Sequence, residues 1–179
     1  MHRDVKEILI SEEEIEAKCK ELGAIITKAY MDYENPPVLV ALLKGSVPFM
    51  AALIKHIDLD IEYDFMDVSR YEGTTSTRDI RILKDLDRSI KNVDILLVED
   101  IVDTGHTIKE TIRILKSKGA NECKIVTLLD KPSRREVDIT ADFIGFEIPN
   151  EFVIGFGLDF NEKYRNLPYI GVLKNEMYE

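Results

Sequence analysis

Apolar residues occur along this chain in two patterns, namely short unbroken runs and stripes that recur every three or four residues. The runs 38–43, 95–98 and 124–129 are rich in branched apolar residues without polar alternation. Such runs are typical of strands buried on both faces of a parallel sheet. We therefore expect three central strands at these positions.

The helical stripes lie between these runs. Ser11 and Glu14 form a capping-box pattern, and the apolar spacing behind them predicts a helix that ends near Met31. A second helix should follow Gly45, with Pro48 in its first turn and a buried stripe of Val47, Met50, Ala51 and Ile54. A third should start at Thr107 and turn Ile108, Thr111, Ile112 and Leu115 inward. Helix and strand thus alternate along the chain.

Shorter strand-like segments complete the pattern, at 61–68, from 80 onward, and at 142–148, 152–155 and 169–173. The polar stretch 69–79 has little apolar content and should be a mobile loop. Alternating strands and helices joined by right-handed crossovers predict an α/β fold with a mostly parallel central sheet and helices on both faces. Ligands of such folds bind beyond the carboxyl ends of the strands.

Composition narrows the class of protein. The 179 residues suit one domain spanning 1–179. A net charge of -10 argues against nonspecific binding of nucleic acid. Two cysteines, Cys19 and Cys123, predict neither a disulfide framework nor a zinc site. Because no apolar stretch approaches the roughly 18 residues of a membrane-spanning helix, we expect no export or membrane insertion and a cytoplasmic location.

The most informative segment follows the apolar run 95–98. Glu99 and Asp100 come first, and a turn of Asp103, Thr104, Gly105 and Thr107 then leads into the third helix. Backbone N–H groups at the start of a helix attract phosphate, whereas two carboxylates beside a phosphate call for a divalent cation or sugar hydroxyls. The segment therefore predicts a site for a phosphorylated sugar with magnesium. The alternative is that Asp103 or Thr104 merely caps the helix.

Two common nucleotide-binding motifs are excluded here, because the Gly-Lys-Ser/Thr of a Walker loop and the three glycines of a dinucleotide fingerprint are both missing. Three segments, Lys44-Gly45, Glu99 to Thr107 and Asp130-Lys131, each lie just past the end of an expected buried strand. They should therefore face one crevice at the same edge of the sheet.

These segments match a known family. The chain resembles type I phosphoribosyltransferases over nearly its whole length, and closely resembles the bacterial hypoxanthine-guanine phosphoribosyltransferases. The superfamily motif is Val98-Glu99-Asp100-Ile101-Val102-Asp103-Thr104-Gly105. Supporting segments are Leu42-Leu43-Lys44-Gly45, Leu129-Asp130-Lys131-Pro132, and Phe152-Val153-Ile154-Gly155 leading into Gly157-Leu158-Asp159. The last two point to the 6-oxopurine branch. The resemblance also implies a small hood region formed by the N-terminal and C-terminal segments.

The resemblance implies transfer of a phosphoribosyl group from phosphoribosyl pyrophosphate to N9 of hypoxanthine or guanine, with Mg²⁺ as cofactor. Glu99 and Asp100 would hold the ribose hydroxyls and the metal, and Asp103 would act as general base toward the purine N7 proton. Thr104, Gly105, His106 and Thr107 would bind the 5′-phosphate with them. Lys44 and Gly45 would bind pyrophosphate, and the family's cis peptide here would be Leu43–Lys44.

The same resemblance assigns the purine pocket. Lys131 would donate to the purine O6, which predicts poor use of adenine, because adenine carries an amino donor at that position. Phe152 would stack on the base and Val153 would offer backbone groups to its edge. Asp159 would lie near a second magnesium and the purine, and Arg165 near pyrophosphate.

Two positions need separate comment. The closing loop of relatives has a serine before its tyrosine, whereas Arg70 precedes Tyr71 here. We expect Arg70 to replace the serine's pyrophosphate contact with a charge. His106 occupies a variable position and contacts the 5′-phosphate when protonated or is otherwise solvated.

Three alternatives remain open. The first is a transferase that also accepts xanthine, and the second is an RNA-binding regulator of the same fold, for which no basic cluster is evident. The third is a nucleotide sensor without turnover, which the presence of Asp103 and Lys131 disfavours. By analogy with relatives, a homodimer or homotetramer is expected.

Overall fold

The computed structural model describes residues 1–70 and 80–178, with Arg70 described by its backbone alone. A six-stranded sheet lies at its centre, in the order β4 (Ile80–Lys84), β3 (Tyr63–Arg70), β2 (Val38–Leu42), β5 (Ile95–Val102), β6 (Cys123–Asp130) and β7 (Phe143–Glu147). All neighbours are parallel except β3 and β4. The mostly parallel sheet predicted from the sequence is therefore confirmed.

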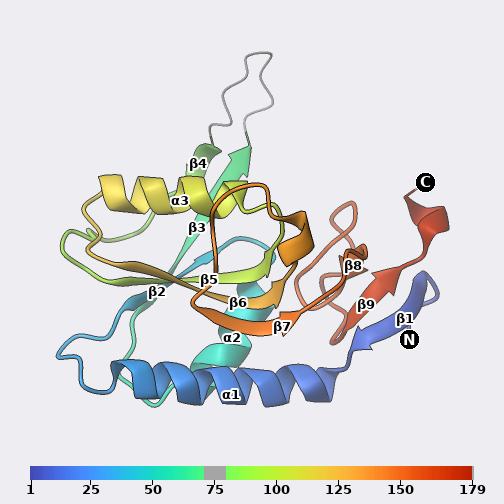
Figure 1. The fold of residues 1–179 in the computed structure, drawn as a ribbon, viewed down its shortest axis with the longest axis horizontal. Coiled ribbons are helices and arrows are strands. Elements are labelled where there is room, and N and C mark those ends of the chain that lie inside the picture. The colour runs from blue at the N-terminus through green and yellow to red at the C-terminus, as the bar shows by residue number, and fades with distance from the viewer. Residues whose placement is uncertain (71–79, 179) are drawn as a thin grey trace.

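Helices cover both faces of this sheet (Figure 1). α1 (Glu12–Tyr30) and α2 (Val47–Leu53) lie on one face and α3 (His106–Ser117) lies on the other. Each central strand sends alternate side chains to the two sides: Leu96 and Val98 of β5 pack into the core beneath α1 and α2, whereas Ile95 and Leu97 pack into the core beneath α3. This double burial explains why the central strands read as unbroken apolar runs.

A second, three-stranded sheet stands beside the first (Figure 1). It is antiparallel, in the order β1 (Val5–Ile10), β9 (Ile170–Leu173) and β8 (Val153–Ile154), so that the first strand of the chain pairs with the last. The sequence pattern did not indicate β1, because only Val5 and Ile10 of its six residues are buried. Three single-turn 3₁₀ helices, Ile54–His56, Pro132–Arg134 and Asn175–Met177, complete the described elements.

Three expectations about local structure need correction. β5 does not end at Val98 but continues to Val102, since its ladder with β6 extends to the pair Val102 and Asp130; Glu99 and Asp100 therefore lie on the strand and not in a loop. The buried residues of α2 are Phe49, Met50, Ala52 and Leu53, whereas the predicted Val47 and Ala51 are exposed. A helix of two turns is too short for its spacing alone to fix which side faces inward.

The third correction concerns the start of α3. The helix begins at His106, one residue earlier than predicted, and its N-cap is Gly105, in the left-handed conformation with φ of 87°. No side chain caps this end, so the interpretation of Asp103 or Thr104 as a helix cap is wrong.

The expected loop at 69–79 lies outside the described residues apart from Ser69 and the Arg70 backbone, which belong to β3. No helix of residues 1–70 or 80–178 is long and apolar enough to cross a membrane.

Candidate active site

Two pockets lie beyond the carboxyl ends of β2, β5 and β6. The first, of about 300 Å³, is lined by predicted residues from two strand ends and a distant loop: Lys44, Gly45, Glu99, Asp100, Asp103, Thr104, Gly105, Thr107 and Arg165. The second, of about 390 Å³, is lined by Asp103, Lys131, Phe152, Val153 and Asp159, together with residues not predicted. Both pockets include Ile101 and Asp103. The three strand-end segments therefore line two adjoining pockets that meet at Asp103.

The first pocket has an acidic floor. Glu99 is 6% exposed, and its Oε1 is buried without a hydrogen-bond partner among the described residues. Burial, followed by the charge of Asp100, raises the pKa of Glu99 well above its ordinary value. Burial also raises the pKa of Asp100 to about 6, although the Ile101 N–H donates to its Oδ1 at 2.8 Å. A buried carboxylate without a partner is costly, so this floor is built to meet a cation or hydroxyl donors.

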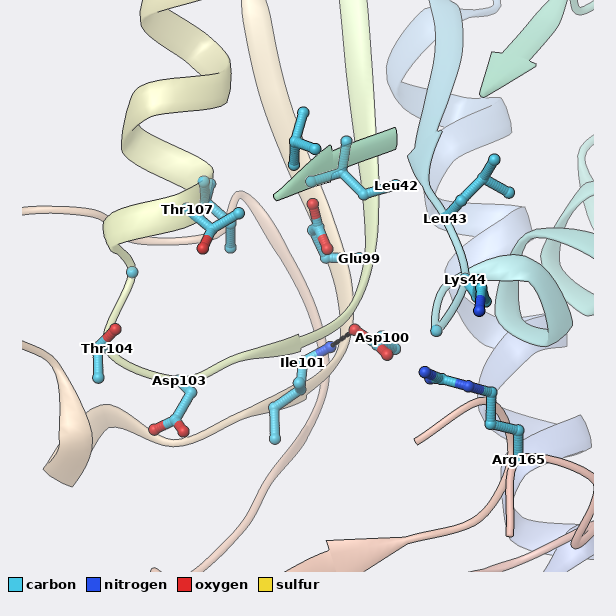
Figure 2. A pocket seen from close by; sticks show the side chains of 14 residues that line it. Leu42, Leu43, Lys44, Glu99, Asp100, Ile101, Asp103, Thr104, Thr107 and Arg165 are labelled. Carbon is cyan, nitrogen blue, oxygen red and sulfur yellow. Dashed lines mark hydrogen bonds between the residues drawn. The ribbon is translucent and has the colours of Figure 1, made fainter. Parts of the chain in front are cut away.

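Cationic side chains line the opposite wall (Figure 2). The Arg165 side chain reaches toward Asp100 and the Lys44 turn from the loop before β9. Lys44 Nζ lies 2.8 Å from Glu162 Oε2, and Arg165 Nη2 lies 3.1 Å from Glu162 Oε1 and 3.0 Å from Asp159 Oδ1. The peptide bond between Leu43 and Lys44 is cis, as the resemblance implied. This wall is therefore suited to a multiply charged anion.

The loop Asp103–Thr107, called the phosphate loop below, closes the third side. Gly105 needs its left-handed φ, and a Cβ there would also lie 2.9 Å from Val137 Cγ2. His106 is absent from the lining of both pockets; its Nε2 lies 2.8 Å from Glu136 Oε2. The loop leads into the twelve-residue α3 and includes its first two residues, and the N-terminal dipole of this helix favours an anion at this position.

The second pocket combines a buried cation with an aromatic wall. Lys131 is 7% exposed, and its Nζ donates to the Glu151 carbonyl at 2.6 Å, while burial lowers its pKa. Phe152 is 38% exposed, and its ring stacks on Tyr178 with ring centroids 5.1 Å apart. One ammonium hydrogen serves Glu151, so two donors remain for a ligand.

Sequence reasoning missed several residues at this site. Arg134 Nε donates to Asp103 Oδ1 at 3.1 Å, and Arg135 Nη1 donates to the Asp103 carbonyl at 2.5 Å. Glu162 and Tyr178 also contact predicted residues. The two arginines lie three and four residues after Lys131, just past the end of β6, which is a detectable signal, whereas Glu162 and Tyr178 lie in loop and tail positions without one. Of the predicted residues, Tyr71 and the Arg70 side chain lie outside the described part of the chain.

Comparison with known proteins gives a consistent result. Residues 6–161 match the model of the phosphoribosyl transferase domain family. The chain is 56% identical to the hypoxanthine-guanine phosphoribosyltransferase of Staphylococcus epidermidis, over 99% of both chains. It is 54% identical to that of Bacillus subtilis, over 100% of this chain and 99% of the relative.

Solved structures agree. A hypoxanthine phosphoribosyltransferase from Staphylococcus aureus superposes with a TM-score of 0.93 at 54% identity, covering 100% of this chain and 97% of the other. The Trypanosoma cruzi enzyme in complex with the product IMP gives a TM-score of 0.93 at 38% identity, over 99% of both chains. The chain therefore belongs to the phosphoribosyltransferase family, in its hypoxanthine-guanine branch.

Proposed function

We propose that this protein transfers the 5-phosphoribosyl group from phosphoribosyl pyrophosphate to N9 of hypoxanthine or guanine, yielding IMP or GMP and pyrophosphate. The observation that carries this proposal is the position of Asp103, which lines both the anionic-sugar pocket and the base pocket. With the sugar in the first pocket and the nucleobase in the second, a carboxylate at this boundary would lie beside the bond that joins them. Relatives that are 56% and 54% identical to this chain carry names that describe the same reaction.

In the proposed reaction, N9 attacks C1′ of the ribose, the C1′–O bond to pyrophosphate breaks, and the proton leaving N7 passes to Asp103. Arg134 already donates to Oδ1 of Asp103, which leaves Oδ2 for that proton. A positioned general base contributes about 10² to 10⁴ in rate. Pyrophosphate departs against Lys44, Gly45 and Arg165, whose positive charge and N–H groups stabilise it.

Magnesium fits the acidic floor. No group of three or more metal-binding side chains occurs in residues 1–70 and 80–178, so a cage built from protein ligands alone is not formed there. Mg²⁺ characteristically uses one or two carboxylates together with substrate oxygens and water. The buried, unpartnered Glu99 Oε1 beside Asp100 supplies such a set, with Asp159 in the adjoining second pocket. The bound cation would neutralise charge on the pyrophosphorylated sugar, and the carboxylates would orient it.

Lys131 carries the specificity of the proposal. Its ammonium group donates and cannot accept a hydrogen bond, so it suits a 6-oxo group and opposes the 6-amino group of adenine. The buried lysine left unpaired by adenine should cost about 1–3 kcal/mol, or about 5- to 150-fold in kcat/KM. Stacking on Phe152 and backbone groups at Val153 would hold the base in its pocket.

An ultraviolet assay with phosphoribosyl pyrophosphate, Mg²⁺ and each of hypoxanthine, guanine, xanthine and adenine tests the proposal. We expect turnover with the first two and little with adenine, and Asp103→Asn should lower kcat by about 10²-fold or more. Asp60→Asn is the matched control, because Asp60 is an exposed carboxylate just before the amino end of β3, the edge opposite the site. Equal rates with adenine and hypoxanthine would refute the role of Lys131.

The same panel separates the alternatives. Turnover of xanthine comparable to guanine would establish the broader 6-oxopurine transferase, whereas binding without turnover would establish a sensor. An RNA titration tests the regulator, which the net charge of -10 disfavours. Assembly into a homodimer or homotetramer and a cytoplasmic location stay predictions, to be measured by analytical ultracentrifugation and cell fractionation.

A further inference from the structure

A segment outside the predicted site holds the phosphate loop along most of its length. This segment, Arg134–Val137, is called the brace below. Arg134 and Arg135 donate to the Asp103 carboxylate and carbonyl respectively, and Glu136 N donates to the Thr104 carbonyl at 3.0 Å. Val137 packs against Gly105, and the Glu136 carboxylate pairs with His106. Four consecutive loop residues thus each contact the brace.

Arg135 connects the brace to the end of β6. Its guanidinium also pairs through Nη2 with Oδ1 of Asp130, and the side chains of these two residues are only 15% and 8% exposed. Asp130 is the last residue of β6, and the next residue, Lys131, donates its N–H to the Val102 carbonyl at 3.0 Å. A planar guanidinium with donors in a rigid fork can hold two acceptors in a set geometry, which a lysine cannot do. Arg135 therefore ties the loop to the rigid end of the sheet.

The orientation of the loop amides follows from these contacts. In a trans peptide, the C=O and N–H point in opposite directions. Because Arg135 holds the Asp103 carbonyl, the Thr104 N–H must point away from Arg135; because Glu136 N holds the Thr104 carbonyl, the Gly105 N–H must point away from the brace. Thr104 and Gly105 both line the first pocket. The brace thus sets two peptide planes at the place where the phosphate is expected.

We propose that Arg135, anchored on Asp130, is a positioning residue for phosphate binding: it fixes the peptide planes of the phosphate loop so that the loop amides meet the 5′-phosphate. The proposal depends on the proposed function only for the identity of the phosphorylated sugar. It assigns no contact between Arg135 and substrate. Its effect should appear in the affinity for the phosphate and in the KM for the sugar substrate, with kcat changed less.

The test separates this role from stability alone. Arg135→Gln removes the guanidinium that contacts the Asp103 carbonyl and leaves the buried Asp130 carboxylate without its partner. The double variant, Asp130→Asn with Arg135→Gln, removes that carboxylate charge as well. In thermal unfolding, the Tm of Arg135→Gln should be clearly below that of the wild type, because the single variant contains an uncompensated buried charge. The double variant should recover most of this loss in Tm. Ribose 5-phosphate is the probe, titrated by calorimetry without purine.

We expect about a tenfold or greater loss of ribose 5-phosphate affinity in Arg135→Gln, no recovery in the double variant, and an intermediate loss in Arg135→Lys. Amide hydrogen exchange at residues 104–107 should be at least about tenfold faster in both Gln-containing variants. Arg88→Gln is the control, because Arg88 pairs with Glu62 on an exposed surface at a separate pocket, and it should change neither quantity.

Recovery of affinity together with stability in the double variant would overturn the proposal, since Arg135 would then act through folding alone. Unchanged affinity and exchange in a folded Arg135→Gln would overturn it as well. Both measurements use the protein without nucleobase or turnover. Failure of wild-type protein to convert hypoxanthine would therefore refute the proposed function while leaving the brace to be judged on its own result.

Discussion

Gly157→Ala provides a test of how the C-terminal part of the chain supports the Lys44–Gly45 turn of the first pocket. Gly157 has φ of 101°, and a Cβ built on it would lie 1.9 Å from the Gly45 carbonyl oxygen and 3.1 Å from Pro48 Cδ. An ordinary carbon–oxygen contact is about 3.3 Å or longer, so the two backbones must separate by more than about 1 Å. The atom that must yield belongs to the Lys44–Gly45 turn.

The magnitude follows from two contributions. An L-residue in the left-handed region costs about 1–2 kcal/mol, and overpacking of this kind costs about 1–3 kcal/mol. The total of about 2–5 kcal/mol corresponds to a fall in Tm of about 4–20 °C for a chain of this size. Displacement of the turn should also raise the KM for phosphoribosyl pyrophosphate, while the KM for hypoxanthine changes little.

Gly119→Ala is the matched control. Gly119 has φ of 93°, but a Cβ there would meet Lys91 atoms no closer than 3.4 Å, an ordinary contact far from both pockets. Backbone strain alone should lower the stability of Gly119→Ala by about 1–2 kcal/mol, and its kinetics should stay at the wild-type level. Differential scanning calorimetry and steady-state kinetics measure both effects. Equal losses of Tm in the two variants, with an unchanged KM in Gly157→Ala, would refute the reasoning.

Three further predictions use the charges of the site. In metal-free protein, the pKa of Asp100 is 3.8 in the unfolded chain and rises to about 6 on folding. The ionised carboxylate is therefore less stable in the folded protein, so the free energy of unfolding falls between about pH 4 and 6 and this loss stays constant above pH 6. Asp100→Asn should therefore raise stability at pH 7.5 by up to about 3 kcal/mol and leave it unchanged near pH 3.5, and equal melting temperatures at pH 7.5 would contradict this. Glu162→Gln should release Lys44 and remove one of the two carboxylates paired with Arg165, and so tighten pyrophosphate binding by about two- to fivefold in calorimetry, whereas weaker or unchanged binding would show that Glu162 does not compete with the anion. Lys131→Met should lower kcat/KM for hypoxanthine by about 10- to 100-fold without lowering that for adenine, and a parallel loss for both bases would argue for a structural role.

The sequence predicted those parts of the fold that have a strong local signal. Buried strands such as Val38–Leu42 and the capped helix behind Ser11 were found within a few residues, because burial on both faces and a capping box each leave a plain local pattern. β1 was missed because it buries little of its own length and pairs only with a strand some 165 residues later, information that no local window contains. The inward side of α2 was misassigned for a related reason, since it depends on where the helix packs.

The candidate site shows the same division. Residues at or just past the carboxyl ends of buried strands, such as Lys44, Glu99 and Lys131, could be grouped in advance because the carboxyl ends of parallel strands share an edge. Glu162 and Tyr178 could not, because their contacts depend on the path of a loop and a tail. The brace could be predicted only in part. Arg135 follows a strand end, which the sequence shows, but its hydrogen bond to the Asp103 carbonyl depends on backbone geometry.

The pairing of β1 with β9 has a consequence for synthesis on the ribosome. β1 leaves the exit tunnel long before its pairing partner β9, and β8, which supplies Val153 to the second pocket, joins the same sheet through β9. The central sheet has all its strands by Glu147 and needs neither β8 nor β9. The wall of the second pocket, by contrast, depends on β9, so chains truncated shortly before Ile170 should form the central sheet without a complete second pocket.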